Sequence, residues 1–311
     1  MKFSPIASES LGVRSLSSYV KLSNGTSILM DPGAALGPKR YGYRPHKREY
    51  IALKEKSNKI YKLSNRADII TVSHYHFDHY TPSFENYFYN WSTEEKAIDV
   101  IKDKKIFAKH PKENINYSQK KRAYYFEKIC RDHSKEINYA DRKDFKIGDA
   151  KLEFSPPVYH GPKGTKLGFV VMTAITESNK TLIHASDVQG PINTKAFKWI
   201  KKRNPNLLIV AGPPEYLVPS KLKKEKYEKA LKNIRNLSEN TKILVDHHIL
   251  RSKEGQKIIA NEEKIMTFAD FLDVDNNFLE SNRKKLHRKE PCSDEFYRKI
   301  KDGYYVENDI K

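Results

Sequence analysis

Cysteine is almost absent from this 311-residue chain, which contains only Cys130 and Cys292. Two cysteines so far apart suggest neither a disulfide framework nor a Cys-x-x-Cys metal site. Long apolar runs are also missing. The longest, residues 167–175, includes Gly168 and Thr173 and falls well short of the ~18 residues of a membrane helix. The first residues contain no apolar stretch typical of a signal peptide. We therefore expect a cytoplasmic protein with no membrane partner.

Acidic residues are in the minority, since 58 Lys and Arg face 39 Asp and Glu for a net charge of +19. Such a charge attracts anionic partners. Residues 39–66 alone hold ten Lys or Arg against two Glu, interleaved with Tyr41, Tyr43, Tyr50 and Tyr61. This mixture suits phosphate contacts combined with base stacking. A lysine-rich surface that only keeps the protein soluble explains the charge equally well.

Short apolar runs alternate with amphipathic segments in both halves of the chain. We predict strands at residues 15–22, 26–31, 67–73, 105–109, 151–154, 168–176, 181–185, 207–211 and 242–246. We predict helices at residues 46–63, 93–102, 118–133, 194–203 and 220–237. The pattern favours α/β sheets covered by helices. It predicts one domain over residues 1–260 and a helical, basic C-terminal extension over residues 261–311.

The most informative stretch is Ser73–Tyr80, which reads SHYHFDHY and directly follows an apolar run. It places His74, His76, Asp78 and His79 within six positions. Imidazole nitrogens and carboxylate oxygens are the ligands that Zn²⁺ accepts. Four such side chains at the end of one strand are hard to explain as packing, although a histidine-rich loop is the simpler alternative. The stretch therefore predicts a metal site.

One loop cannot supply all the ligands of a two-metal site, so the remaining ligands must come from elsewhere. Other strand ends provide candidates at Asp31, His160, Asp187 and the pair His247-His248. Each is weak alone, because an aspartate at a strand end is more often a turn former. His184, close to Asp187, is more often structural than catalytic at such a position.

Taken in order, these residues resemble the metallo-β-lactamase superfamily, whose motifs run Asp, HxHxDH, His, Asp, His. The resemblance spans residues ~1–250, and the stretches around His160, Asp187 and His247 look like a mainly archaeal subgroup. It implies a four-layer αββα sandwich. It also implies two zinc ions per chain, with manganese or iron as alternatives.

The resemblance also implies a role for each residue. His74, His76 and His160 would hold the first ion. Asp78, His79 and the last histidine would hold the second, and Asp187 would bridge the two. We prefer His247 as the last histidine because Arg251 follows four positions later, as in related nucleases, but strand alternation equally allows His248. Asp31 would orient a ligand.

This site predicts a binuclear hydrolase in which a metal-bound hydroxide is the nucleophile and Asp78 helps to orient it or to manage its proton. The charge favours an anionic phosphodiester, in RNA, DNA or a nucleotide, with Lys163 and Lys166 as substrate contacts. A lactone or thioester hydrolase of the same fold is the alternative. A nucleic-acid-binding module that retains a structural metal is a further one.

Overall fold

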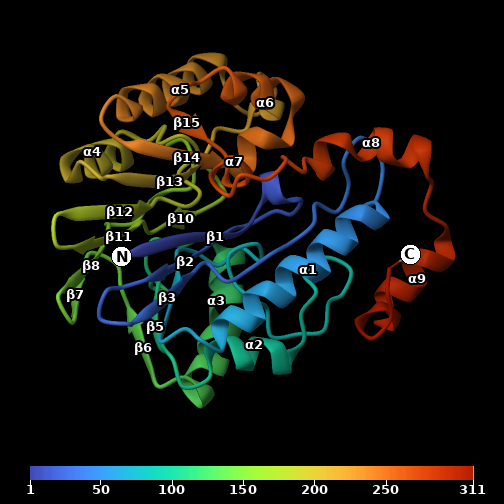
Figure 1. Ribbon diagram of the computed structural model, residues 1–311, viewed down its shortest axis with the longest axis horizontal. Helices are drawn as coiled ribbons and strands as arrows, with labels where there is room; N and C mark the ends of the chain where they lie inside the picture. Colours follow the sequence, from blue (N-terminus) through green and yellow to red (C-terminus); the bar gives the residue numbers. More distant parts are fainter. Residues whose placement is uncertain (311) are drawn as a thin grey trace.

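The computed structural model describes residues 1–310 and contains two β-sheets packed face to face between two layers of helices (Figure 1). The first sheet has six strands in sequential order. These are β1 (Lys2–Ser8), β2 (Leu16–Lys21), β3 (Ser27–Met30), β4 (Ile69–Val72), β5 (Lys105–Ala108) and β6 (Glu136–Tyr139). Strands β1 to β3 run antiparallel, and β3 to β6 are parallel.

The second sheet has seven strands in the order β15-β14-β13-β12-β11-β8-β7. These are β7 (Asp144–Ile147), β8 (Ala150–Phe154), β11 (Thr173–Glu177), β12 (Lys180–His184), β13 (Leu207–Ala211), β14 (Lys242–Asp246) and β15 (Ile265–Met266). A separate pair joins β9 (Val158–Tyr159) to β10 (Phe169–Val170). Strands β12 to β15 are parallel, so their carboxyl ends meet at one edge of the sheet.

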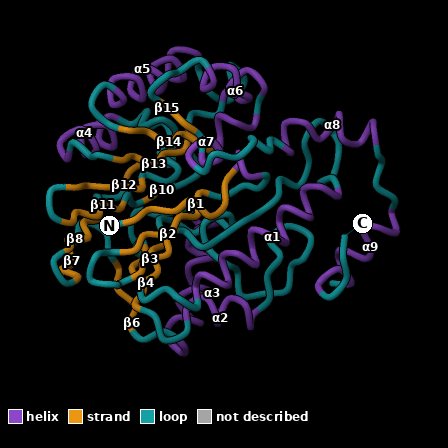
Figure 2. The backbone as a smooth tube through the Cα atoms, viewed as in Figure 1, coloured by secondary structure: helices purple, strands orange, loops and turns teal. Residues whose placement is uncertain are grey.

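Helices cover the outer faces of both sheets, as the tube in Figure 2 shows. The first sheet is covered by α1 (Lys47–Ser64), α2 (Glu94–Ile101) and α3 (Tyr117–His133), and the second by α4 (Thr194–Arg203), α5 (Lys224–Ser238) and α6 (Lys253–Ala260). The chain ends with α7 (Phe268–Phe271), α8 (Leu279–Lys289) and α9 (Asp294–Lys301). The expected four-layer αββα arrangement is confirmed.

The three largest of the protein's apolar cores hold these layers together. Leu16, Ile28, Ile175 and Leu244 fill the space between the sheets. The other two cores lie between each sheet and its helices. All four residues of β4 are buried, as expected of a parallel strand packed on both faces. Strand ends are therefore held rigidly, which fixes the loops that follow them.

The predicted elements agree closely in the second half, where α4, β13 and β14 have the expected bounds. Three elements differ from the prediction. Strand β1 was missed because Pro5 interrupts it, at a sheet edge where a proline and an irregular register are tolerated. The expected strand 168–176 is two strands, β10 and β11. Helix α5 begins at Lys224, after a 3₁₀ turn, rather than at Ser220.

Helix α3 packs one of its faces against the first sheet. Its apolar face, with Ala123, Phe126 and Cys130, packs in the same core as Val72 of the first sheet. Helix α3 is therefore part of the outer layer. None of the helices within residues 1–310 is both long and apolar enough to cross a membrane.

Residues of the predicted C-terminal extension pack against the first sheet's helical layer. Leu279, Phe296 and Ile300 belong to the same core as residues of α1. Arg283 is fully buried and donates two hydrogen bonds to the buried Glu49 carboxylate of α1, at 2.7 and 2.8 Å. This part of the chain is thus tied to α1 by a buried ion pair.

Replacing Glu49 with alanine should destabilise the protein by about 3–5 kcal/mol, because the buried Arg283 charge would lose its partner. Thermal or urea unfolding measures this loss. Glu55→Ala on the same helix is the matched control, since the Glu55 side chain is exposed, and should change stability by about 0.5 kcal/mol or less. Equal effects of the two variants would show that the buried ion pair does not stabilise the fold.

The tyrosines of the basic segment 39–66 are mostly engaged inside the protein. Tyr50 is buried, and the Tyr61 hydroxyl donates to the carbonyl of Trp91 at 2.7 Å. Tyr43 stacks on the ring of His287, with centroids 5.0 Å apart. Of the four tyrosines, Tyr41 is the exposed one. The segment therefore offers little ring surface for base stacking.

Candidate metal centre

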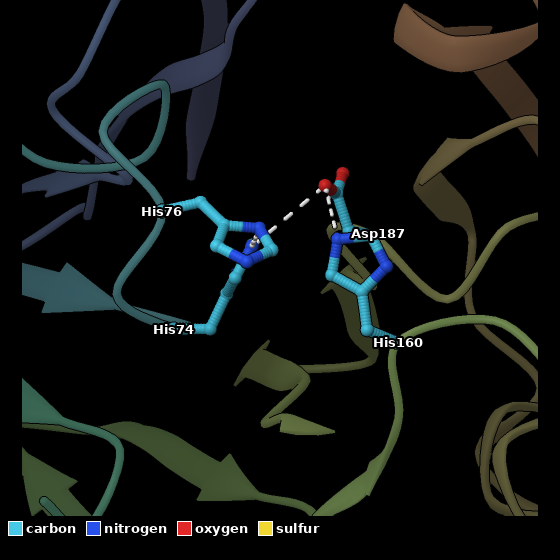
Figure 3. Close-up of side chains that lie close together, drawn as sticks. All are labelled: His74, His76, His160 and Asp187. Carbon is cyan, nitrogen blue, oxygen red and sulfur yellow. Dashed lines mark hydrogen bonds and ion pairs between the residues drawn. The ribbon is translucent and has the colours of Figure 1, made fainter. Parts of the chain in front are cut away.

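Loops from the two sheets meet at one point, and each brings metal-capable side chains. The loop after β4 carries His74, His76, Asp78 and His79, while His160 follows β9 and Asp187 follows β12. Figure 3 shows His74, His76, His160 and Asp187 pointing toward one another. These four residues of the predicted metal site therefore converge.

The first group joins His74, His76, His160 and Asp187, whose ligand atoms all lie within 4.8 Å of one another. His160 Nε2 lies 2.9 Å from Asp187 Oδ2, and His74 Nε2 lies 3.7 Å from it. The His74 and His76 ring nitrogens are 3.0 Å apart. Three imidazoles and one carboxylate form a set of zinc-type ligands.

The second group joins Asp78, His79 and His247. His247 Nε2 lies 3.4 Å from Asp78 Oδ2, and His79 Nε2 lies 3.9 Å from Asp78 Oδ1. Asp187 serves both groups, because its Oδ2 is 3.2 Å from His79 Nε2 and its Oδ1 is 3.7 Å from His247 Nε2. One carboxylate between two such groups has the geometry of a bridging ligand.

Asp31 lies behind the cluster and fixes its histidines. Its carboxylate accepts hydrogen bonds from His79 Nδ1 at 2.9 Å, from the Ser73 hydroxyl at 2.6 Å and from the Ser186 hydroxyl at 2.8 Å. Because Nδ1 of His79 donates to Asp31, Nε2 is the ring nitrogen that faces the cluster. A side chain at Gly33 would come within 2.3 Å of the Tyr80 amide nitrogen, so this glycine allows the turn after Asp31 to approach the histidine loop.

The backbone at His247 explains why strand alternation could not indicate whether His247 or His248 faces the cluster. His247 has a φ of +66°, in the left-handed region, so the chain leaves the extended conformation directly after β14. Both rings then lie on the same side, stacked with centroids 4.4 Å apart. His248 Nε2 is 3.4 Å from Asp187 Oδ2. Of the two histidines, His247 also lies within 4 Å of Asp78.

Buried polar contacts hold this unusual turn. Asp246 accepts hydrogen bonds from the hydroxyls of Ser8 and Ser10 and from the amides of Ser10, His247 and Phe268. Arg251 places Nη2 3.0 Å from His247 Nε2 and donates to Glu9 at 3.0 Å. Residues near the N-terminus thus position a side chain of the cluster.

The pKa values of three of the histidines are lowered, which favours the neutral state that metal binding requires. Burial, together with the neighbouring histidines, lowers the pKa of His74, and burial lowers the pKa of His76 to about 3. Burial and the Arg251 charge lower the pKa of His247. Burial opposes the charge on His79, but Asp187 and Asp78 outweigh it and raise its pKa. Neutral imidazoles have the free lone pairs that a metal ion requires.

Several polar atoms of the cluster are buried without a hydrogen-bond partner among the described residues. They include His79 Nε2, His160 Nε2 and Asp187 Oδ1. Unpaired buried polar atoms are costly in a folded protein. All three belong to the groups described above, so a bound cation would satisfy them together. The residues present therefore fit a metal centre.

The cluster opens into a cleft of about 910 Å³. Lys163 and Lys166, predicted to contact the substrate, both line it, as do Pro214 and Tyr216 of the turn after β13. Its cationic lining residues are Arg14, Arg122, Lys163, Lys166, Lys221, Lys226 and Arg251, and its acidic ones are Asp78 and Asp187. Away from the cluster itself, the cleft is strongly basic.

Comparison with known proteins agrees with this geometry. The β-lactamase superfamily domain matches residues 14–234. The chain is 46% identical to the UPF0282 protein of Thermococcus gammatolerans, covering 93% of this chain and 96% of that protein. It is 48% identical to the UPF0282 protein of Pyrococcus furiosus, covering 94% of each. The chain belongs to the UPF0282 family of the β-lactamase superfamily.

Membership of the β-lactamase superfamily and of an archaeal family confirms the resemblance seen in the sequence. Most proteins of the superfamily are metal-dependent hydrolases, and the histidine and aspartate cluster of this UPF0282 chain fits a metal site. Among solved structures, the chain is similar to Tm1679, a metal-dependent hydrolase of the β-lactamase superfamily. The TM-score is 0.49 at 13% identity, covering 85% of this chain and 94% of that one.

Sequence reasoning missed the residues that support the cluster. Ser73 and Ser186, each directly before a metal-capable residue, hold Asp31. The Gln189 amide lies 3.3 Å from His160 Nδ1. A serine next to a histidine or aspartate is too common to be a signal alone. His184 hydrogen-bonds the Leu16 carbonyl at 2.9 Å, which agrees with the structural role expected of it.

Proposed function

We propose that this chain is a binuclear zinc hydrolase that cleaves phosphodiester bonds in nucleic acid or nucleotides. The positive charge of the cleft is the observation that supports a phosphodiester substrate. Five of its cations, Arg122, Lys163, Lys166, Lys221 and Lys226, make no ion pair within 4 Å among residues 1–310. Unpaired cations around a cleft favour an anionic substrate.

In this proposal, His74, His76 and His160 would hold one ion, Asp78, His79 and His247 would hold the other, and Asp187 would lie between the two sets of ligands. When bound, such a pair of ions lowers the pKa of a water molecule to near neutrality and neutralises charge on the substrate. Asp31 keeps His79 in the required tautomer. Manganese or iron could replace zinc with the same ligands.

Other side chains of the cleft would orient the attacking water and bind the substrate. Asp78 lines the cleft and is 18% exposed, against 1% for Asp187, so it is the carboxylate placed to orient the attacking water. His248 also lines the cleft, and it forms a metal-capable group with Asp187 and His247, so it is the alternative last ligand. Lys163 and Lys166 would bind phosphate oxygens at the cleft rim.

A substrate panel tests the proposal. Purified protein should hydrolyse bis-p-nitrophenyl phosphate and release nucleotides from labelled RNA or DNA, while lactones and glutathione thioesters stay intact. Cleavage of a thioester or lactone with no phosphodiester turnover would contradict the proposal and support the small-molecule alternative. Binding of nucleic acid with no hydrolysis of any substrate would instead support a binding module.

Replacing Lys163 and Lys166 with alanine should raise KM for a nucleic acid substrate by about tenfold, because each loses a charge-assisted contact. The value of kcat should change little, since neither lysine contacts the metal ligands. Steady-state kinetics at two salt concentrations measure the effect, and the salt dependence of KM should weaken. Lys198→Ala, an exposed lysine of α4, is the matched control. An unchanged KM would remove both lysines from the substrate site.

A further inference from the structure

A second hollow lies beside the metal cleft and is lined largely by aromatic rings. It measures about 530 Å³ and includes Phe77, Phe84, Tyr117 and Tyr125, together with Lys121 and Arg122. We call it the aromatic hollow. Tyr117 and Tyr125 belong to the N-terminal half of α3, while Phe77 lies in the histidine loop. A hollow of this size accommodates a planar ring system.

The aromatic hollow adjoins the metal cleft. Phe77 and Arg122 line both. Phe77 stands between His76 and Asp78 in the sequence, and the Arg122 guanidinium lies 4.3 Å from the centre of its ring. A molecule bound in the hollow therefore lies next to the cleft that contains the cluster.

The rings of the hollow are unusually exposed. Tyr117 is 85% exposed, Tyr125 is 52% exposed and Phe84 is 42% exposed. These side chains contribute little to the core, because the buried face of α3 is formed by other residues. Exposed aromatic surface gathered around one hollow is typical of a binding site.

The charge around the hollow favours an anionic partner. The first ten residues of α3 include Lys120, Lys121 and Arg122 and no acidic residue. None of these three cations forms an ion pair within 4 Å in the described chain. The positive end of the helix dipole lies at the same end of α3. Aromatic rings interleaved with free cations match the way proteins bind single strands, by stacking on bases and contacting the phosphate backbone.

We propose that the aromatic hollow is a base-stacking subsite for single-stranded nucleic acid, which leads the strand into the metal cleft. This inference rests on the proposed phosphodiesterase function and names its substrate class. A single strand is required, because the flat faces of bases are covered by stacking in a duplex. Tyr117 and Tyr125 provide the stacking surfaces, and Lys121 and Arg122 contact the phosphates on the way to the cleft.

The test measures binding separately from cleavage. Fluorescence anisotropy of labelled oligouridylate and oligothymidylate, in the presence of a chelator, gives affinities without hydrolysis. A Tyr117→Ala/Tyr125→Ala double variant should bind both oligonucleotides about tenfold to a hundredfold more weakly. Tyr124→Ala is the matched control, because Tyr124 is 63% exposed on the same helix but does not line the hollow. It should bind within about twofold of the unmodified protein.

Two competitors identify the chemistry. Inorganic polyphosphate carries the charge without bases, so the double variant should bind it as well as the unmodified protein does. Polyglutamate should compete poorly with the oligonucleotides. The inference is overturned by equal oligonucleotide affinities in the double variant and the unmodified protein. It is also overturned by an equal loss of polyphosphate binding, or by polyglutamate that competes as well as RNA.

Failure of this inference is distinguishable from failure of the proposed function. Tyrosine-dependent binding without any nucleic acid hydrolysis would reject the phosphodiesterase and keep the subsite. Hydrolysis of single strands by the double variant with an unchanged KM would reject the subsite and keep the phosphodiesterase. A comparison of single strands with their duplexes completes the test, because duplex binding that is equally tyrosine-dependent would contradict base stacking.

Discussion

An Asp187→Asn variant is expected to lose hydrolytic activity by at least about 10³-fold while it keeps its fold. Asp187 lies between the two groups of ligands and approaches His79, His160 and His247 with its two oxygens. Asparagine has the same shape but no charge, so it cannot bridge two cations. Elemental analysis should find fewer than two ions per chain. The melting temperature should change by only about 5 °C or less, because no cavity is created.

A buried histidine nearby provides the control for this result. His184 is buried on β12 but donates to the Leu16 carbonyl rather than facing the cluster. His184→Ala should cost about 1–3 kcal/mol of stability and keep the full metal content. If Asp187→Asn instead unfolded the protein and retained its metal, Asp187 would have a structural role and the bridging assignment would be wrong.

Removal of metal is expected to abolish activity reversibly. Protein as purified should carry about two ions per chain, and a chelator should remove them with loss of hydrolysis that added zinc or manganese restores. The fold should persist, because the large apolar cores contain none of the metal-capable side chains. Circular dichroism and the melting temperature follow the fold, and elemental analysis follows the ions.

The number of ions discriminates between the hypotheses. A structural zinc site is normally one ion in a closed cage of four ligands. One tightly held ion whose removal unfolds the chain would therefore contradict the binuclear hydrolase. If two ions exchange while the fold is retained, the result would agree with the binuclear hydrolase. In that case the strands hold the ligand loops in position without the ions.

The sequence predicted the fold well wherever a strand is continuously apolar or a helix has a clear amphipathic pattern. Strand β14 and helix α4 are examples, since one is apolar and buried and the other has a clear amphipathic pattern. Short or partly exposed strands escaped prediction. Strand β6 has one exposed and three half-buried residues, so its sequence carries little strand signal, and the pairing with β5 is what makes it a strand.

The candidate site was predictable for a different reason. Its ligands are chemically rare residue types at strand ends, so their order along the chain was informative before any contact was known. The choice between His247 and His248 was not predictable, because it depends on the left-handed backbone of His247. Nor was the network around Asp246, which joins Ser8 and Ser10 to a strand more than two hundred residues away.

The two sheets each carry only part of the ligand set. Asp31 and the histidine loop follow strands of the first sheet, Asp187 and His247 follow strands of the second, and His160 follows β9 of the separate two-stranded pair. A chain still being synthesised, or one cut between the sheets, therefore has no complete centre in either piece. An incomplete chain would therefore lack the full set of ligands. Any metal-dependent activity would begin only after both parts of the fold had come together.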